Sequence, residues 1–182
     1  MSMDGLQERI RKRKCALIVD LTVLPGALPK EYGEVPFVQG YCAYIRALLK
    51  GLKGMVPGVR FSLGLFSLLG GEALSQLPGL TREAGELGYY VLLETPQLNG
   101  QALAEFTAQT LLGTESPYHC DGVQIPFYSG SDVLTPFLPY CEKEKKDVFV
   151  CVRTPNRSAP ELQDLLTGSR LVHMAAANRV SR

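Results

Sequence analysis

The stretch Val148–Asp164, with the sequence VFVCVRTPNRSAPELQD, decides the fold class of this chain. It opens with an apolar, β-branched run up to Val152, which predicts a buried strand. Ser158 and Glu161 then stand at capping-box spacing, with Pro160 in the first turn, where a missing N–H costs little. The stretch therefore predicts a buried strand, a polar loop and a helix over residues 159–166.

The polar loop holds the first candidate site residues, which are Arg153, Thr154 and Asn156. In parallel α/β proteins, the loop after the carboxyl end of a strand is where ligands are held. A second interpretation is that these side chains only cap the helix that follows, because such loops serve both purposes. The sequence leaves both interpretations open.

The same alternation of strand and helix runs along the chain. Strands are expected at residues 15–19, 56–65, 89–93, 121–125 and 148–152, and helices at 37–53, 72–87, 101–112, 133–141, 159–166 and 171–180. Pro78 and Gly79 are expected to break or kink the second of these helices, and Ser131 to cap the fourth. The order predicts an α/β fold, a parallel sheet of about five βα units with right-handed crossovers. Residues 1–14 are expected to form a polar N-terminal helix or extension, and residues 15–182 the domain.

The composition excludes several classes of partner. The 182 residues carry 19 basic and 18 acidic side chains, a net charge of +1, so we expect neither a nucleic-acid nor a membrane partner. The basic cluster Arg9–Lys14 could touch an anion, but a solvated helix face is the favoured interpretation. No apolar run reaches the ~20 residues of a membrane span, and no signal peptide is recognised.

Cysteine usage points to a reducing compartment. The five cysteines are an odd number and lack Cys-x-x-Cys spacing. Cys15 and Cys151 fall within expected strands, so buried free thiols and a cytoplasmic location are predicted. His119 and Cys120 are adjacent but have no companion ligands at zinc spacing, so no metal is expected. No cofactor is expected either, because the Walker and G-x-G-x-x-G motifs are absent.

Three charged residues stand in or at the ends of the expected strands. Asp20 and Glu94 close the first and third strands, so both could face one mouth and act as an acid/base pair. Arg60 lies inside the second strand, where a charge is costly unless it is paired. The alternative is that Glu94 simply neutralises Arg60 from the neighbouring strand.

Four stretches of the chain, taken in order, resemble the orotidine 5′-phosphate decarboxylase family, specifically its longer bacterial type. They are Cys15–Asp20 with Leu28-Pro29, Val56–Arg60, Asp121–Leu138 and Val148–Asp164. The last resembles Val-Phe-Val-Leu-Val-Arg-Thr-Ser-Asn-Pro…Glu-Leu-Gln-Asp-Leu and is the most specific. The resemblance implies a divergent relative with a partial TIM barrel.

The resemblance also implies positions for the family's chemistry. These enzymes use a Lys on the second strand and Asp-x-Lys-x-x-Asp after the third, whose middle Lys protonates the substrate carbon as carbon dioxide leaves. The four positions fall here on Arg60, Glu94, Pro96 and Asn99, and none keeps its identity. Pro155 replaces the Ser that contacts the pyrimidine. Asp20, Arg153, Thr154 and Asn156 keep the pattern, and with Arg60 and Glu94 they form the candidate substrate-binding set.

An eight-stranded barrel needs ~250 residues, so the family's later strands, whose loops grip the substrate phosphate, would follow Arg182. Open sheet edges favour association, with a second copy or with a homologous chain. We therefore expect a protein without decarboxylase activity that works through association. One alternative is altered chemistry on a nucleotide or sugar phosphate. Another is a residual decarboxylase of pyrimidine (UMP) biosynthesis, a lyase, completed by another chain.

Overall fold

A five-stranded parallel sheet forms the centre of the molecule. The structure is a computed structural model that describes residues 3–96 and 98–181. The strands β1 (Ile18–Asp20), β2 (Gly58–Ser62), β3 (Tyr90–Glu94), β4 (Gly122–Pro126) and β5 (Asp147–Cys151) lie side by side in chain order. Every neighbouring pair is parallel, which confirms the predicted α/β fold. Within the described residues no strand pairs with the outer edges of β1 and β5, so the sheet is open.

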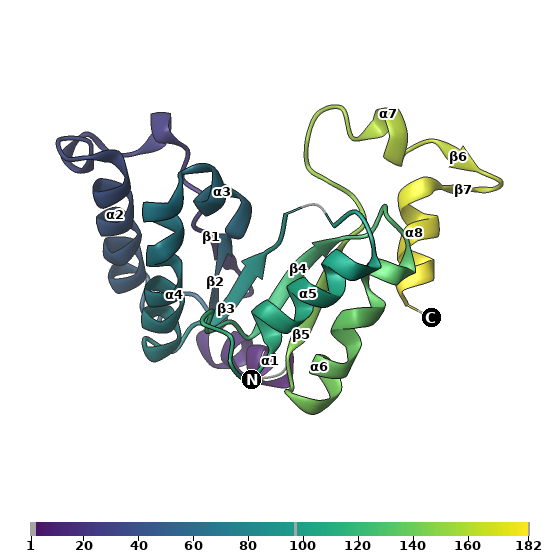
Figure 1. The fold of residues 1–182 in the computed structure, drawn as a ribbon, viewed down its shortest axis with the longest axis horizontal. Coiled ribbons are helices and arrows are strands. Elements are labelled where there is room, and N and C mark those ends of the chain that lie inside the picture. Colours follow the sequence, from purple (N-terminus) through teal and green to yellow (C-terminus); the bar gives the residue numbers. More distant parts are fainter. Residues whose placement is uncertain (1–2, 97, 182) are drawn as a thin grey trace.

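One face of the sheet is covered by helices and holds the main core (Figure 1). The helices are α2 (Phe37–Gly51), α4 (Gly71–Glu86), α5 (Gln101–Leu112) and α6 (Leu138–Lys143). The strands contribute alternate residues to this face, all of them apolar: Val59, Phe61, Val91, Leu93, Val123 and Ile125. Each fully buried side chain of this size stabilises the fold by roughly 1.5–3 kcal/mol.

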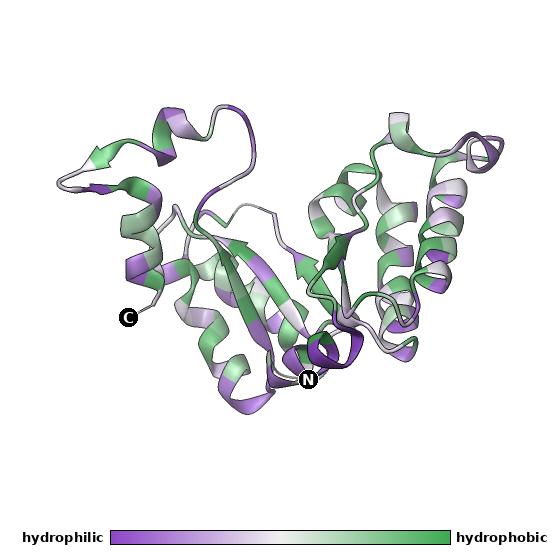
Figure 2. Ribbon diagram, turned by 180° about the vertical axis from the view of Figure 1, so that it is seen from behind, coloured by the Kyte–Doolittle hydropathy of each residue, from purple (hydrophilic) through white to green (hydrophobic). Residues whose placement is uncertain are grey.

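The other face of the sheet, here called the inner face, is apolar only at the amino ends of the strands. There α1 (Met3–Arg13) packs Leu6 against Tyr90 and Leu92, with Phe149 at the margin. Figure 2 shows this helix as a largely hydrophilic element at the foot of the sheet. The helix thus covers the amino end of the inner face, and the carboxyl end is left for polar residues.

Two members of the basic cluster fasten α1 to the body. Arg9 Nε donates to Gly88 O at 3.1 Å, and Arg13 Nη1 donates to Val56 O at 2.7 Å. Arg11, Lys12 and Lys14 are exposed, so the interpretation as a solvated face holds for these three only. In the described part of the chain, no helix is long and apolar enough to cross a bilayer.

Two element boundaries differ from those expected around the second strand. The strand ends at Ser62, because the Ser62 hydroxyl accepts the Leu65 N–H at 3.1 Å and starts α3 (Leu63–Leu68). Of the expected break or kink at Pro78 and Gly79, a break is wrong, since α4 continues through both residues. The Thr81 hydroxyl donates to the Leu77 and Pro78 carbonyls, and the buried residues Leu77 and Leu80 hold the helix on the sheet.

The segment before β5 is more irregular than predicted. Two 3-10 turns, η3 (Ser131–Val133) and η4 (Thr135–Phe137), precede α6. Pro136 and Pro139 each lack an N–H and interrupt the helical ladder. Ser131 does not cap the helix by its side chain; its carbonyl accepts from the Thr135 hydroxyl at 2.9 Å.

The C-terminal part also differs. The helix α7 (Pro160–Gln163) is only four residues long, and Ser158 is not its cap, because Ala159 holds that position without a side-chain bond. A hairpin of β6 (Leu166–Thr167) and β7 (Arg170–Leu171) follows, turning at Gly168 with φ +63°, and leads into α8 (Val172–Val180). The predicted helix over residues 159–166 is therefore wrong beyond Gln163.

The cysteines are free, as expected, but they are not buried where expected. Cys15 precedes β1 and is half-buried, and Cys151 at the end of β5 is half-buried too. The buried thiols are Cys42 and Cys120, and burial raises the pKa of Cys120 to about 12.

Replacing Leu6 by Ala tests the role of α1. Leu6→Ala should lower the free energy of unfolding by about 2–3 kcal/mol, because it opens a cavity between α1 and the inner face. The control Leu68→Ala changes a helical leucine that is 87% exposed and should stay within about 0.5 kcal/mol of the parent. Urea unfolding measures both. Equal effects of the two substitutions would show that α1 is not part of the folded body.

Candidate active site

Polar side chains gather on the inner face at the carboxyl end of the sheet. The strand register aligns Asp20 with Arg60 on β1 and β2, and aligns Glu94 with Gln124 on β3 and β4. Residues aligned across neighbouring strands point to the same face. In a parallel α/β sheet this edge is where ligands bind.

Arg60 is held by two partners. Its Nη2 atom lies 2.5 Å from Asp20 Oδ2, and its Nη1 donates to Gln124 Oε1 at 3.1 Å. Asp20 also accepts the Thr22 hydroxyl and N–H on its other oxygen, at 2.7 Å and 3.1 Å. Burial opposes ionisation of Asp20, but the bonds from Arg60 and Thr22 outweigh it and hold the pKa of this carboxyl below its usual value.

Glu94 does not neutralise Arg60, contrary to the second interpretation of the sequence. The register aligns Arg60 with Leu92, so Glu94 lies one pleat further along β3, opposite Ser62. The Ser62 hydroxyl donates to Glu94 Oε2 at 2.6 Å. Asp20 is the carboxylate that pairs with Arg60, and the proposed pair of Asp20 and Glu94 is split between two different partners.

Pro96 and Asn99 lie beyond the end of β3 and are exposed. Proline offers no donor, and no hydrogen bond of the Asn99 side chain is found among the described residues. The four positions that correspond to the catalytic residues of the resembling family therefore do not form one charged cluster. Two are bonded to other groups, and two face solvent.

The side chains of the loop after β5 are bonded to Gln163 and Asp164, at the carboxyl end of α7. Arg153 makes a two-pronged contact with Asp164, at 3.0 Å and 2.9 Å, which holds the pKa of that carboxyl below its usual range. Gln163 accepts the Thr154 N–H at 2.8 Å and donates to its hydroxyl at 2.7 Å. That hydroxyl in turn donates to Asn156 Oδ1 at 2.5 Å.

The side chains of Arg153, Thr154 and Asn156 do not cap the amino end of α7, where Ala159 is the N-cap residue without a side-chain bond, although the Asn156 carbonyl accepts the Ala159 N–H at 3.1 Å. Their polar side-chain atoms instead form hydrogen bonds with each other and with Gln163 and Asp164. The uncharged surface of the loop, rather than its charged groups, is therefore left to contact a ligand.

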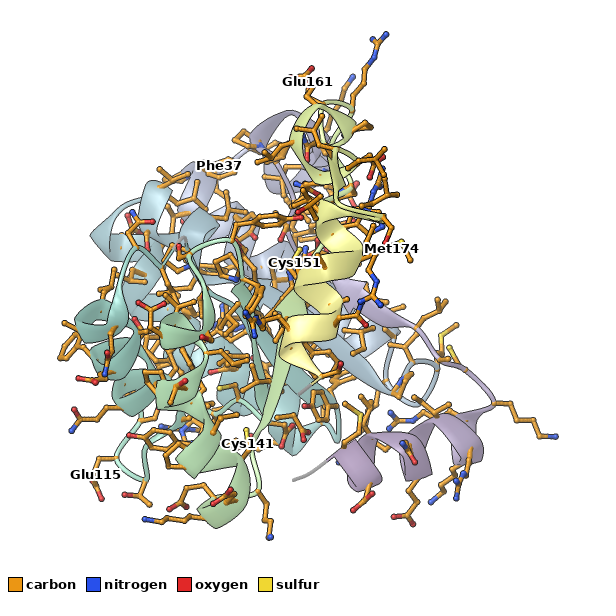
Figure 3. The ribbon with its side chains drawn as sticks, turned by 90° about the vertical axis from the view of Figure 1, so that its right-hand side faces the viewer. Phe37, Glu115, Cys141, Cys151, Glu161 and Met174 are labelled. Carbon is orange, nitrogen blue, oxygen red and sulfur yellow. The ribbon has the colours of Figure 1, made fainter. Side chains whose placement is uncertain are left out.

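A small cavity of about 240 Å³ lies between the ends of β3, β4 and β5. Its lining joins the loop after β5 to the inner face of the sheet: Glu94, Thr95, Gln124, Ile125, Pro126, Cys151, Thr154 and Pro155. The cavity thus brings together two candidate residues, Glu94 and Thr154, but none of its lining comes from Asp20, Arg60, Arg153 or Asn156. Figure 3 marks Cys151 at the end of β5.

Sequence reasoning missed three members of this site, Ser62, Gln124 and Cys151. A signal for Gln124 was present, because it is a polar residue inside the apolar run of the fourth strand, as Arg60 is in the second. Ser62 follows Arg60 at strand spacing and so shares its face. Within residues 3–96 and 98–181, no group of three or more His, Cys, Asp or Glu side chains could hold a metal ion.

Comparison with known proteins gives no matching family model, but it does give curated relatives. Orotidine 5′-phosphate decarboxylase from Rhodopirellula baltica is 26% identical over 145 residues, which are 78% of this chain. The enzyme of the same name from Caldicellulosiruptor bescii is 25% identical over an alignment that covers 97% of this chain. These similarities support membership of the chain in the orotidine 5′-phosphate decarboxylase family.

Solved structures of orotidine 5′-phosphate decarboxylases share the fold. The putative orotidine 5′-phosphate decarboxylase from Streptomyces avermitilis superposes over 100% of this chain with a TM-score of 0.86 at 20% identity. The OMP decarboxylase from Leishmania donovani superposes over 98% with a TM-score of 0.78 at 23% identity. The sheet is therefore part of a TIM-type barrel.

The chain spans about half to two thirds of the length of these relatives. It covers 48% of the Rhodopirellula protein and 64% of the Caldicellulosiruptor protein. For the Streptomyces structure the share is 65%. Five strands out of the eight of a TIM barrel account for a share of this size.

Substituting Asp20 tests the pairing with Arg60 through pH. A carboxyl whose pKa is lowered by folding adds stability above its unfolded value near 3.8, and this stability is lost as the pH falls through the lower folded value. The pair is partly exposed, so between pH 6 and pH 3 the parent should lose about 0.5–1 kcal/mol more than Asp20→Asn in urea unfolding. The exposed control Asp132→Asn should behave like the parent. Equal losses in the parent and Asp20→Asn would contradict the pairing.

Proposed function

We propose that this chain is a non-catalytic member of the orotidine 5′-phosphate decarboxylase family that works by associating with a second copy of itself. The observation that carries the first half of the proposal is the state of the four family positions. Arg60 is bonded to Asp20 and Gln124, Glu94 is bonded to Ser62, and Pro96 and Asn99 are exposed.

Decarboxylation in this family needs an acid that protonates the carbon left by carbon dioxide. A positioned acid contributes a factor of roughly 10²–10⁴ to a rate and needs a pKa near the working pH. Pro96, at the position of that acid, has no proton to give. Arg60 is no substitute, because a guanidinium stays protonated far above working pH and this one is already held by two acceptors.

The open edges of the sheet support the second half of the proposal. An edge strand offers unpaired N–H and C=O groups to another chain. Next to the edge of β5, the segment from α7 to α8 exposes large apolar side chains (Figure 3, where Glu161 marks α7 and Met174 marks α8). They are Leu162, Leu165, Leu166 and Met174, with exposed fractions of 57%, 51%, 74% and 49%. A surface of this kind is typical of an interface.

A second copy is the occupant that this surface fits best. Two copies related by a two-fold axis would bury the same apolar segment on each side. Such a contact is closed, because the edge of β5 in each copy is then covered and cannot bind a further chain. Neither the leucines nor Met174 brings a charge that would oppose such a self-pairing.

The catalytic half of the proposal is tested with orotidine monophosphate. Incubated with the purified protein, the substrate should keep its ultraviolet absorbance at the rate of a protein-free sample, because no acid faces it. A full-length relative of the family serves as the positive control. Turnover above the protein-free rate that co-elutes with the protein would overturn the proposal.

Light scattering coupled to gel filtration tests the association. The parent should elute with the mass of a dimer, and Leu166→Asp should shift it to the monomer, because a buried carboxylate is costly at an apolar interface. The control Leu68→Asp changes a similarly exposed leucine on α3 and should leave the dimer intact. A monomeric parent at micromolar concentration, or equal effects of the two substitutions, would contradict a β5-side dimer.

A further inference from the structure

We propose that a cavity at the amino ends of the strands binds a compact polyanion, a small molecule that carries two or more phosphate or carboxylate charges. This amino-end cavity lies between α1 and the loops that follow α2 and α4. It is lined by Gly5, Glu8, Arg9, Lys12, Arg13, Gly54 and Gly88. The proposal goes beyond the proposed function, because the cavity shares no residue with the carboxyl end of the sheet or with the segment from α7 to α8.

One side of α1 supplies the charges of the amino-end cavity. Arg9, Lys12 and Arg13 stand three and four residues apart, a spacing that places them on the same side of a helix. Against these three cations, the described lining includes one acidic side chain, Glu8. Figure 2 shows the helix as a largely hydrophilic element at the foot of the sheet. The cavity therefore presents an excess of positive charge.

Two guanidinium groups converge on a single oxygen in this cavity. Arg9 Nε donates to Gly88 O at 3.1 Å, and Arg13 Nη2 donates to the same oxygen at 3.3 Å. Positive groups this close repel each other, and an anion beside them lowers that repulsion. The shared carbonyl and the bond from Arg13 Nη1 to Val56 O, at 2.7 Å, also hold the groups in place. Such pre-organisation lowers the entropic cost of binding.

The charges of Arg13 and Lys12 are not neutralised by a carboxylate within the described residues. Both acceptors of Arg13 are backbone carbonyls, which carry no net charge. By contrast, Arg46, Arg60 and Arg153 each form an ion pair with a carboxylate. The positive charge at the amino-end cavity is therefore available to a ligand.

A purely structural role for the basic side chains does not account for Lys12. Fastening of α1 explains why Arg9 and Arg13 bond to carbonyls. Lys12 lines the same cavity but bonds to no group in the described part of the chain. It is exposed, so its ammonium group can move to meet an anion held by Arg13.

Two glycines leave one wall of the cavity as bare backbone. Gly54 and Gly88 have φ angles of +80° and +88°, a region that favours glycine. A Cβ atom at Gly54 would meet no heavy atom within 4 Å, and at Gly88 the nearest would be Arg13 Nη2 at 3.9 Å. A ligand can therefore come close to the cations without meeting a side chain from these loops.

The lining also sets the class of ligand. A volume of about 770 Å³ falls within the roughly 300–1,000 Å³ of small-molecule sites. The described lining consists of glycines and charged side chains, so recognition rests on charge and not on apolar contact. Guanidinium groups suit the paired oxygens of phosphates and carboxylates. A net charge of +1 for the whole chain gives no general attraction to nucleic acids or anionic membranes, which favours a compact anion.

Isothermal titration calorimetry on the full chain, in a low-salt buffer free of phosphate, tests the proposal. Pyrophosphate and citrate are the two probes, and they distinguish phosphate from carboxylate chemistry. At least one of them should bind with a Kd of about 1 mM or tighter. Because the site is open to solvent, about 0.3 M sodium chloride should weaken that binding by about threefold or more.

Two substitutions with opposite expected effects locate the binding. Lys12→Gln should weaken it by about fivefold or more, because it removes a cation from the lining. Glu8→Gln should tighten it by about twofold or more, because it removes the acid that repels the ligand. The control Lys30→Gln makes the same change in net charge at an exposed lysine outside the cavity and should leave the affinity unchanged. A circular-dichroism melt confirms that each variant is folded.

The proposal is overturned if neither pyrophosphate nor citrate binds, if Lys12→Gln and Lys30→Gln weaken binding equally, or if Glu8→Gln weakens it. A short single-stranded oligonucleotide and vesicles of phosphatidylserine and phosphatidylcholine are titrated in parallel. Binding of either one without binding of a small anion would also overturn it, since the basic side of α1 would then serve a macromolecule. None of these readouts involves turnover or the mass of the protein in solution, so a failure here leaves the proposed function untouched.

Discussion

The contact of Arg60 with Asp20 and Gln124 is the interaction on which the inner face of this sheet depends. It ties β1, β2 and β4 together at the level where a ligand would enter. A guanidinium in a strand must be paired, and here it is paired within the protein. The consequences follow in order: Arg60 is not free for an anion, Gln124 must turn its nitrogen toward the cavity, and Glu94 is left to Ser62.

The two ends of the inner face differ in character, since one is apolar and packed and the other is polar. At the amino end, Leu6 of α1 closes the apolar cluster around Tyr90 and Leu92. At the carboxyl end lie polar residues, of which Glu94 and Gln124 line a cavity. The fold of the resembling family is thus kept, while Arg60 and Glu94, at two of its catalytic positions, are bonded to other side chains, and Pro96 and Asn99, at the other two, are exposed.

Much of the fold could be predicted from the sequence, because it rests on local patterns. The apolar runs ending at Asp20, Glu94 and Val152 predicted three of the parallel strands, and the helix expected at residues 37–53 corresponds to α2, whose buried residues Tyr41, Ile45 and Leu49 recur every four positions. Irregular pieces could not be predicted. The Ser62 hydroxyl ended β2 early, Pro136 and Pro139 split the fourth helix, and a turn at Gly168 produced a hairpin. The partners of Arg60 depend on register across strands, which no local pattern contains.

A double-mutant cycle measures the central contact most directly. Substituting Arg60→Gln and Asp20→Asn, singly and together, should give a coupling free energy of about 0.5–1 kcal/mol in urea unfolding, because the pair is partly exposed. The matching cycle of Arg60→Gln with Glu94→Gln should give a coupling near zero, since Glu94 is bonded to Ser62. No coupling to Asp20 together with a clear coupling to Glu94 would contradict this account of the inner face.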